Sequence, residues 1–244
     1  NVRFIASDGV LADTEIVAIT VFDQGGSVPP GRVPDLMAQI NGNAIRLTWS
    51  PISTDSVGLP TLIDRYIIYR GTRAYFNPTP AESIGGVAAA IGEFTDNDLN
   101  GADVVGDANT NYFYAVKVVD QIGRVSNVSN RVGEYDYPMV ISPSTDFNLA
   151  GLPFANTGLI TAQDVINSMG GTTNINTLNN YIPSSQSYQA RFAAGFGTNF
   201  AVAPGSVFQV NVKTNFTWSI AGRVPDSGST SYPILTTPTT DYSL

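Results

Sequence analysis

The side chains best suited to bind a metal ion gather in one acidic run of the sequence. The run contains Asp96, Asp98 and Asp103, with Asn100 and Asp107 close by. Carboxylate and amide oxygens are the ligands that calcium prefers, so the run is a candidate calcium site and calcium is the candidate cofactor. The alternative is an Asp- and Asn-rich turn, in which such side chains bond to the nearby backbone. The glycines of the run stand out of register with the helix-loop-helix calcium pattern, which favours the turn.

Candidate catalytic acids share no motif. Two carboxylates placed together could hydrolyse a glycosidic bond. The glutamates are instead scattered along the chain, as surface acids generally are, at Glu15, Glu82, Glu93 and Glu134. Histidine and cysteine are absent, which removes the usual general base, thiolate nucleophiles and the commonest zinc ligands. We therefore expect a protein that is not an enzyme, and we name no catalytic residue.

A second chemistry that the sequence offers is the stacking of aromatic rings against sugars. Six aromatic residues of the C-terminal part could take this role: Tyr181, Tyr188, Phe192, Phe196, Phe200 and Trp218. The alternative is packing inside a β-sandwich, for which Phe200 and Trp218 alternate as core residues should. An exposed row of three rings would favour a glycan partner, and buried rings would favour packing.

The composition limits the classes of partner. The chain has 244 residues and a formal charge of −8. A phosphate backbone would repel it, and no basic patch reverses the sign locally, so we expect no nucleic-acid partner. No apolar run reaches the roughly 18–20 residues of a membrane-spanning helix, so we expect no membrane span. No leader stands at the N-terminus, so any secretion signal is expected to have been removed or to lie upstream.

The elements that would position these residues are mostly strands. Val, Ile, Thr, Tyr and Phe alternate with a period of two between clusters of Gly, Pro, Asn and Asp, which predicts strands along most of the chain. One segment has helical periodicity instead. Thr161 can cap this helix, and a Gly-Gly pair follows it. Val165, Ile166 and Met169 share one helical face.

Residues 1–22 are predicted to form a hairpin, with alternation around Phe4 in the first strand and Ile16–Phe22 as the second. The run from Phe4 to Val21 resembles the last two strands of a cadherin-like or related bacterial immunoglobulin-like domain. A lone hairpin has no second layer to cover its apolar face. The resemblance therefore implies that the rest of the domain, or another chain, covers it. The Gly/Pro-rich residues 23–32 are the predicted linker.

Five segments of residues 33–135 carry a family resemblance. In order, they are a first strand at Val33–Ile40, a second at Ala44–Ser50 containing Trp49, a third at Ile63–Gly71 containing Tyr66, the segment Phe94–Leu99, and two last strands within Asn111–Ser129. They resemble the fibronectin type III family. The resemblance implies a sandwich core with Trp49, Tyr66, Tyr112 and Tyr114, and it makes Tyr112 the candidate tyrosine corner. It implies a spacer or adhesion module and no chemistry.

Residues 137–231 form a predicted third unit that contains the short helix. Its characteristic pairs and triplets are Phe147-Asn148-Leu149, Gln186-Ser187-Tyr188, Asn199-Phe200, Pro204-Gly205 and Thr217-Trp218. They resemble a β-rich repeat of large bacterial surface proteins, often found beside fibronectin type III modules. The resemblance implies no catalytic role.

The segment Tyr137–Leu149 recurs as Tyr232–Leu244, with six of thirteen positions identical. Self-similarity at a fixed offset indicates an array of like domains, so residues 232–244 are the first strand of a further repeat or a donor strand. Two explanations stay open, namely a longer parent protein, or addition of this strand to a sheet of another subunit with the hairpin completing the joint. The candidate assembly residues are Tyr232, Pro233, Ile234, Leu235, Tyr242, Leu244, Val2, Phe4, Ile16 and Ile19.

Together these patterns predict an all-β protein of tandem immunoglobulin-like β-sandwich domains, with one short helix in the C-terminal domain. We expect a non-enzymatic structural subunit or segment of an extracellular or cell-surface assembly (a filament, stalk or adhesin) of prokaryotic origin. Its expected partners are like subunits or neighbouring domains of the same array. The alternative is a glycan-binding accessory region of a secreted polysaccharide-degrading enzyme.

Overall fold

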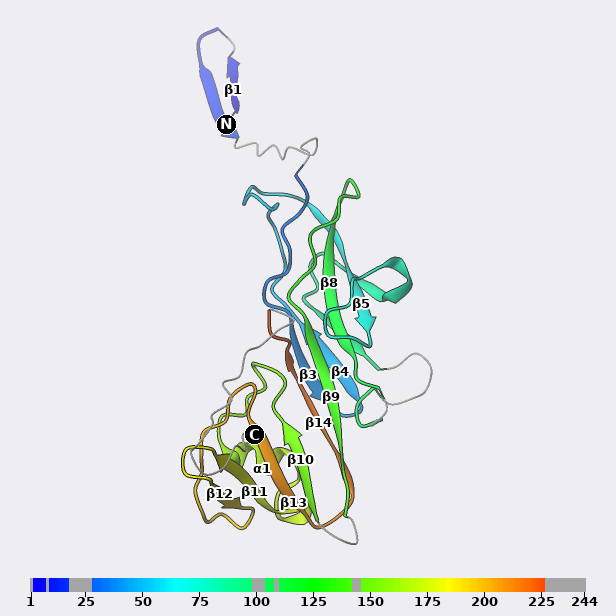
Figure 1. Cartoon of the computed structure of the whole chain (residues 1–244). Helices are drawn as coiled ribbons and strands as arrows, with labels where there is room; N and C mark the ends of the chain where they lie inside the picture. Colours follow the sequence, from blue (N-terminus) through cyan, green and yellow to red (C-terminus); the bar gives the residue numbers. More distant parts are fainter. Residues whose placement is uncertain are drawn as a thin grey trace.

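The structure, a computed structural model, describes residues 2–7, 9–17, 28–97, 104–107, 110–141 and 146–226. The described part is built mainly from strands, with one short α-helix (Figure 1). Its strands form antiparallel sheets of two, three, five and four strands. The predicted all-β, immunoglobulin-like architecture with a short helix is confirmed.

The two-stranded sheet is an N-terminal hairpin of β1 (Val2–Ser7) and β2 (Ala12–Val17). A hairpin was predicted here, but its second strand begins at Ala12 rather than at Ile16. The reason is the tight turn at Gly9, whose φ of 91° suits glycine and lets the chain reverse early. Residues 18–22 of the predicted strand lie outside the described part.

The first sandwich consists of the three-stranded and five-stranded sheets. The three-stranded sheet has the order β3-β4-β7, with β3 (Met37–Asn41), β4 (Ala44–Thr48) and β7 (Glu93–Asp96). The five-stranded sheet has the order β14-β9-β8-β5-β6, with β14 (Phe216–Arg223), β9 (Val132–Met139), β8 (Phe113–Asp120), β5 (Ile63–Gly71) and β6 (Ser83–Ala88), and a 3-10 turn, η1 (Pro80–Glu82), precedes β6. Alternation builds its core, since Ile45 and Leu47 are buried while Arg46 between them is exposed.

The last strand of the first sandwich lies later than predicted. The sequence placed the last two strands within Asn111–Ser129, and only β8 falls there. Between β8 and β9, the N–H groups of Ser126 and Ser129 donate to the carbonyl oxygens of Val118 and Val116, but the return bonds go to hydroxyl groups and not to the backbone. The backbone N–H groups of Val116 and Val118 donate to the Oγ atoms of Ser129 and Ser126, each at 2.9 Å. Side-chain bonds of this kind compete with regular pairing and delay the next strand.

The second sandwich is built around the four-stranded sheet of order β10-β13-β11-β12. Its strands are β10 (Phe147–Gly151), β13 (Val207–Val212), β11 (Ile175–Ile182) and β12 (Ser187–Phe192), accompanied by α1 (Ala162–Ser168) and a 3-10 turn, η2 (Gly171–Thr173). The helix is confirmed as predicted. Thr161 caps it by accepting a hydrogen bond from the N–H of Asp164, Val165 and Ile166 are buried, and Gly170 follows with a φ of 92°.

One sheet serves both sandwiches. β14 comes from the C-terminal part of the chain, yet it pairs with β9 through eight consecutive residue pairs. On β8, Tyr114 and Val116 enter the core of the first sandwich, whereas Phe113 and Ala115 enter the core of the second. The five-stranded sheet is therefore covered on both faces. β9 runs uninterrupted through residue 136, where the sequence suggested a border between units.

Candidate functional site

The joint between the two sandwiches, formed by β9 and β14, is the candidate functional site. Tyr137 of β9 lies directly opposite Trp218 of β14, and their rings stack with centroids 5.4 Å apart and an interplanar angle of 24°. Trp218 is 2% exposed, and its Nε1 donates to the Oγ of Ser168 at 3.1 Å. A large aromatic surface thus connects the two strands with the end of α1.

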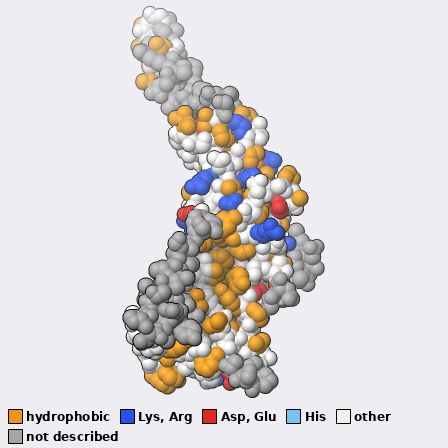
Figure 2. Space-filling model, viewed as in Figure 1, with side chains coloured by type: hydrophobic (Ala, Val, Ile, Leu, Met, Phe, Trp, Pro, Cys, Tyr) orange, Lys and Arg blue, Asp and Glu red, His pale blue; other side chains and the backbone are white. Residues whose placement is uncertain are grey.

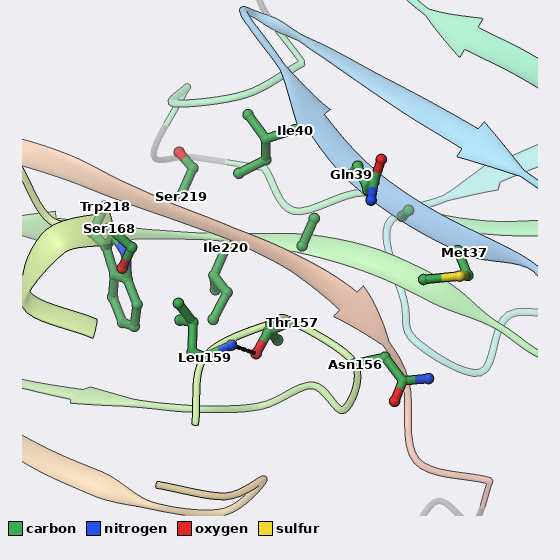
Figure 3. Close-up of a pocket in the computed structure, with 13 residues that line it drawn as sticks. Met37, Gln39, Ile40, Asn156, Thr157, Leu159, Ser168, Trp218, Ser219 and Ile220 are labelled. Carbon is green, nitrogen blue, oxygen red and sulfur yellow. Dashed lines mark hydrogen bonds between the residues drawn. The ribbon is translucent and has the colours of Figure 1, made fainter. Parts of the chain in front are cut away.

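A groove lined by both apolar and polar side chains runs beside the joint. Its volume is about 520 Å³, and Figure 3 shows side chains of β3 and of residues 156–159 on either side of β14. Met37 and Ile40 of β3 are 42% and 40% exposed, and hydrophobic side chains gather over the middle of this face (Figure 2). Among the described residues, none that lines the groove is titratable.

β3 and β14, which border the groove, are the edge strands of their sheets. In the described part, β3 pairs with β4, and β14 pairs with β9 apart from a bridge between Arg223 and Ala155. Backbone groups at a sheet edge can bond to a further strand.

Two buried carboxylates of β9, Glu134 and Asp136, form hydrogen bonds to segments next to the joint. Glu134 is fully buried, and the N–H of Tyr112 donates to its Oε1 at 2.6 Å, while its Oε2 has no partner. Burial raises the pKa of Glu134 to about 8, assisted by the charges of Asp136 and Asp107 and opposed by the Tyr112 bond. The prediction that Glu134 is a scattered surface acid was wrong. Its alternation with Val132 on a mostly buried strand is the signal that could have revealed it.

Asp136 connects the same strand to its neighbours. Its Oδ2 accepts a hydrogen bond from the N–H of Gly106 at 2.7 Å, and its Oδ1 accepts one from the Oγ of Ser219 on β14. The backbone N–H of Asp136 donates to the Oδ1 of Asn111. A nearly buried carboxylate is thus used to hold β9, β14 and the 104–111 segment together.

Of the predicted calcium ligands, Asp96 is the one that the structure describes, and Asp98 and Asp103 lie outside the described residues. Asp96 is buried, and its Oδ2 accepts from the Nη1 of Arg70 and from the hydroxyl of Tyr114, both at 2.9 Å. Burial, with the adjacent Asp96, raises the pKa of Tyr114, which keeps this phenol a donor. The described residues contain no group of three His, Cys, Asp or Glu side chains that could hold a metal ion. The calcium site stays a prediction.

The four predicted fold-core aromatics occupy two environments. Trp49, Tyr66 and Tyr114 are buried, and Trp49 meets Tyr66 edge to face at 5.3 Å. The hydroxyl of Tyr66 accepts a hydrogen bond from the N–H of Ile52 at 2.6 Å. Tyr112 is half-buried, and the guanidinium of Arg70 lies 4.8 Å from its ring centroid.

Most of the predicted assembly residues lie outside the described part of the chain. These are Tyr232, Pro233, Ile234, Leu235, Tyr242, Leu244 and Ile19. Val2 and Phe4 are described as backbone of β1, opposite Val17 and Glu15. Ile16 on β2 is 67% exposed. Their role in assembly stays a prediction.

The six aromatic residues considered for sugar stacking divide into two groups. Phe200 and Trp218 are buried, in agreement with their alternation, and Tyr181 is half-buried with its hydroxyl on the Oε1 of Gln186 at 2.7 Å. Tyr188, Phe192 and Phe196 are exposed, by 52%, 37% and 57%. Packing explains the first group, and the second group presents rings to solvent.

No protein-family model matches the chain, and no curated protein matches it. Similar solved structures include the pectate lyase PelI from Erwinia chrysanthemi in complex with tetragalacturonic acid, at 29% identity and a TM-score of 0.28, covering 40% of this chain. This chain spans 27% of that lyase. No helix among the described residues is long and apolar enough to cross a membrane.

Fibronectin type III domains are also among the similar structures. The third such domain of the human KIAA0343 protein is 12% identical, with a TM-score of 0.30, and the match covers 53% of this chain and 98% of that one. The chicken CNTN1 FN1–FN3 domains are 13% identical, with a TM-score of 0.33, and the match covers 91% and 74%. TM-scores this low carry no argument about family or activity. The immunoglobulin-like architecture rests on the strand order and register of the chain itself.

Proposed function

We propose that this chain is a non-enzymatic structural segment of an extracellular surface assembly, in which tandem β-domains act as rigid spacers. The observation that carries the proposal is the β9–β14 ladder with its eight residue pairs. Neighbouring domains usually meet through small polar interfaces and move relative to each other. Here a change of angle between the sandwiches would break the ladder and expose the Tyr137–Trp218 stack.

The repeated segment extends this proposal to an array. Tyr137, Pro138 and Met139 open the first copy, and all three pair with β14. Their counterparts in the second copy are Tyr232, Pro233 and Ile234. We propose that these residues form the same ladder with a strand equivalent to β14, either in a following unit of the same chain or in another subunit. The surface location and the prokaryotic origin belong to this proposal, and the resemblance to surface-protein repeats supports them.

The two tryptophans provide a test of the rigid joint, because Trp49 lies in the core of the first sandwich and Trp218 in the core of the second. The variants Trp49→Phe and Trp218→Phe each leave one fluorescent reporter. Each variant is unfolded in urea and followed both by tryptophan fluorescence, which reports on one sandwich, and by far-ultraviolet circular dichroism, which reports on the whole chain. If the joint is rigid, the two unfolding curves of each variant should coincide. Separate transitions for the two sandwiches in either variant would contradict the rigid joint.

Electron microscopy of the native assembly tests the array. The expected result is a density in which residues 232–234 pair with a strand of another unit, as residues 137–139 pair with β14. A parent protein that is monomeric and has no following unit would contradict the proposed array, while the rigid joint would stand on the urea experiment.

A further inference from the structure

A row of aromatic and amide side chains crosses the outer face of the four-stranded sheet. The register places Phe147 opposite Asn211, Asn211 opposite Thr177, and Thr177 opposite Phe192, so that one row runs over β10, β13, β11 and β12. The inner face is the hydrophobic one, with Phe208, Val210 and Leu178 among its buried members. The row is therefore on the solvent side, and its two phenyl rings stand three strand spacings, or about 14 Å, apart.

A pocket of about 510 Å³ follows this row, and we call it the Phe192 pocket. Phe147, Phe192 and Phe196 line it and are 45%, 37% and 57% exposed. Phe192 and Phe196 stack on each other, with centroids 4.3 Å apart and an interplanar angle of 15°. Exposed apolar rings grouped around a hollow mark interaction sites more often than isolated ones do.

The polar groups of the Phe192 pocket are amides and hydroxyls. The Nδ2 of Asn176 donates to the Oδ1 of Asn211 at 2.6 Å. An amide side chain has two donor hydrogens and an oxygen with two lone pairs, so this bond leaves both residues further hydrogen-bonding capacity. Thr172 and Thr177 also line the pocket. Flat rings beside amide and hydroxyl groups match a sugar, whose ring presents an apolar face and whose rim carries hydroxyls.

Among the described residues that line the pocket, Lys213 is the one charged side chain and none is a carboxylate. Its Nζ donates to the backbone oxygen of Thr172 at 2.7 Å, which uses one of its three hydrogens. The chain has a net charge of −8, whereas the described lining of this pocket carries a positive charge. An anionic ligand would gain a charge-assisted hydrogen bond here and would be repelled by the protein as a whole.

We propose that the Phe192 pocket binds an oligosaccharide that bears carboxylate groups, with a sugar ring on Phe196 and a carboxylate on Lys213. The length of the row suits a short oligosaccharide rather than a single sugar. A peptide strand is a poorer fit, because the site lies on the face of a sheet, where side chains and not backbone groups are presented. This binding role goes beyond the structural role proposed above and does not depend on it.

Titration of the 244-residue chain with trigalacturonate, followed by amide chemical shifts and by calorimetry, tests the proposal. Shifts should concentrate on the strands of the Phe192 pocket, and the neutral trisaccharide maltotriose should bind more weakly. Phe196→Ala should weaken trigalacturonate binding about tenfold, because it removes an exposed stacking surface. Lys213→Gln should weaken it by about fivefold to tenfold and reduce its dependence on salt.

Tyr188→Ala is the matched control, since Tyr188 is an exposed ring of the same sheet and does not line the pocket. It should leave binding unchanged. The proposal is overturned by the absence of shifts in the pocket at millimolar trigalacturonate, or by equal affinities of the wild-type, Phe196→Ala and Lys213→Gln proteins. Equal binding of maltotriose and trigalacturonate would overturn the assigned charge of the ligand. All three variants change exposed side chains, and circular dichroism checks that each is folded.

Discussion

Tyr137 and Trp218 face each other across the β9–β14 ladder and stack with their ring centroids 5.4 Å apart. One of them precedes the second sandwich in sequence and the other follows most of it. The pair therefore closes the second sandwich onto the first, and both rings belong to a core that also includes Phe113 and Ala115 of β8.

Removal of the Trp218 ring should destabilise the whole chain. Trp218→Ala deletes a buried indole and its bond to Ser168, and truncations of this kind cost about 3–5 kcal/mol. Urea unfolding followed by far-ultraviolet circular dichroism measures the loss. Tyr188→Ala, which removes a half-exposed ring that packs on Tyr181 across the strand pair, should cost about 1 kcal/mol or less. Similar losses in both variants would show that the joint adds nothing specific.

Glu134 should make stability depend on pH. Its pKa rises from 4.5 to about 8 on folding, so the folded protein holds a proton that the unfolded chain releases between these values. Stability therefore falls as the pH rises from about 4.5 to about 8, and it levels off above that. Glu134→Gln keeps an acceptor for Tyr112 and removes the titration, so it should be more stable than the wild type at pH 8, by up to about 4 kcal/mol.

Thermal or urea unfolding of Glu134→Gln at several pH values checks this expectation. Glu93→Gln is the control, because it makes the same chemical change at an exposed glutamate and leaves Glu134 in place. Parallel pH profiles for the wild type and Glu134→Gln would rule out Glu134 as the source of the dependence.

The ion pair between Arg70 and Asp96 should contribute more than the ion pair between Arg46 and Glu93. The side chains of the first pair are 17% and 4% exposed, and Asp96→Ala removes a buried carboxylate that accepts hydrogen bonds from Arg70 and from the Tyr114 hydroxyl. We expect a loss of about 3–5 kcal/mol. The second pair is about half exposed, and Glu93→Ala should cost about 0–1 kcal/mol. Equal losses, measured by urea unfolding, would contradict this ranking.

The cap of α1 should have a measurable effect despite the shortness of the helix. Thr161→Ala removes the acceptor of the Asp164 N–H and one side of the capping box, which costs about 1 kcal/mol. Thr161→Ser keeps the hydroxyl and should restore most of the stability. If both substitutions lower the midpoint of thermal unfolding equally, the methyl group rather than the cap is responsible.

Local patterns predicted those parts of the fold that depend on local chemistry. The alternation of Ile45, Leu47 and Trp49 defined the inner face of β4, and Thr161 with the Gly-Gly pair defined the helix limits. Each of these signals lies within a few residues of the element that it specifies.

Long-range pairing could not be predicted in the same way. The alternation of Trp218 indicated a buried side chain, but no local pattern indicates that its strand pairs with β9. For the same reason no local pattern indicates that both faces of β8 are buried, each in the core of a different sandwich. The Phe192 pocket is a similar case. Phe192 and Phe196 were candidates from sequence, whereas the register of separate strands brings Phe147 and Asn211 to them.

The place where the repeated segment begins bears on how such genes change length. The first copy starts at Tyr137, inside the part of β9 that pairs with β14. Recombination between the two homologous stretches would insert or delete 95 residues, the offset from Tyr137 to Tyr232. Both copies begin with a Tyr-Pro pair followed by an apolar residue, so the crossover product has this sequence in either case. In the proposed array, an exchange of this kind would therefore keep the strand residues that pair with β14.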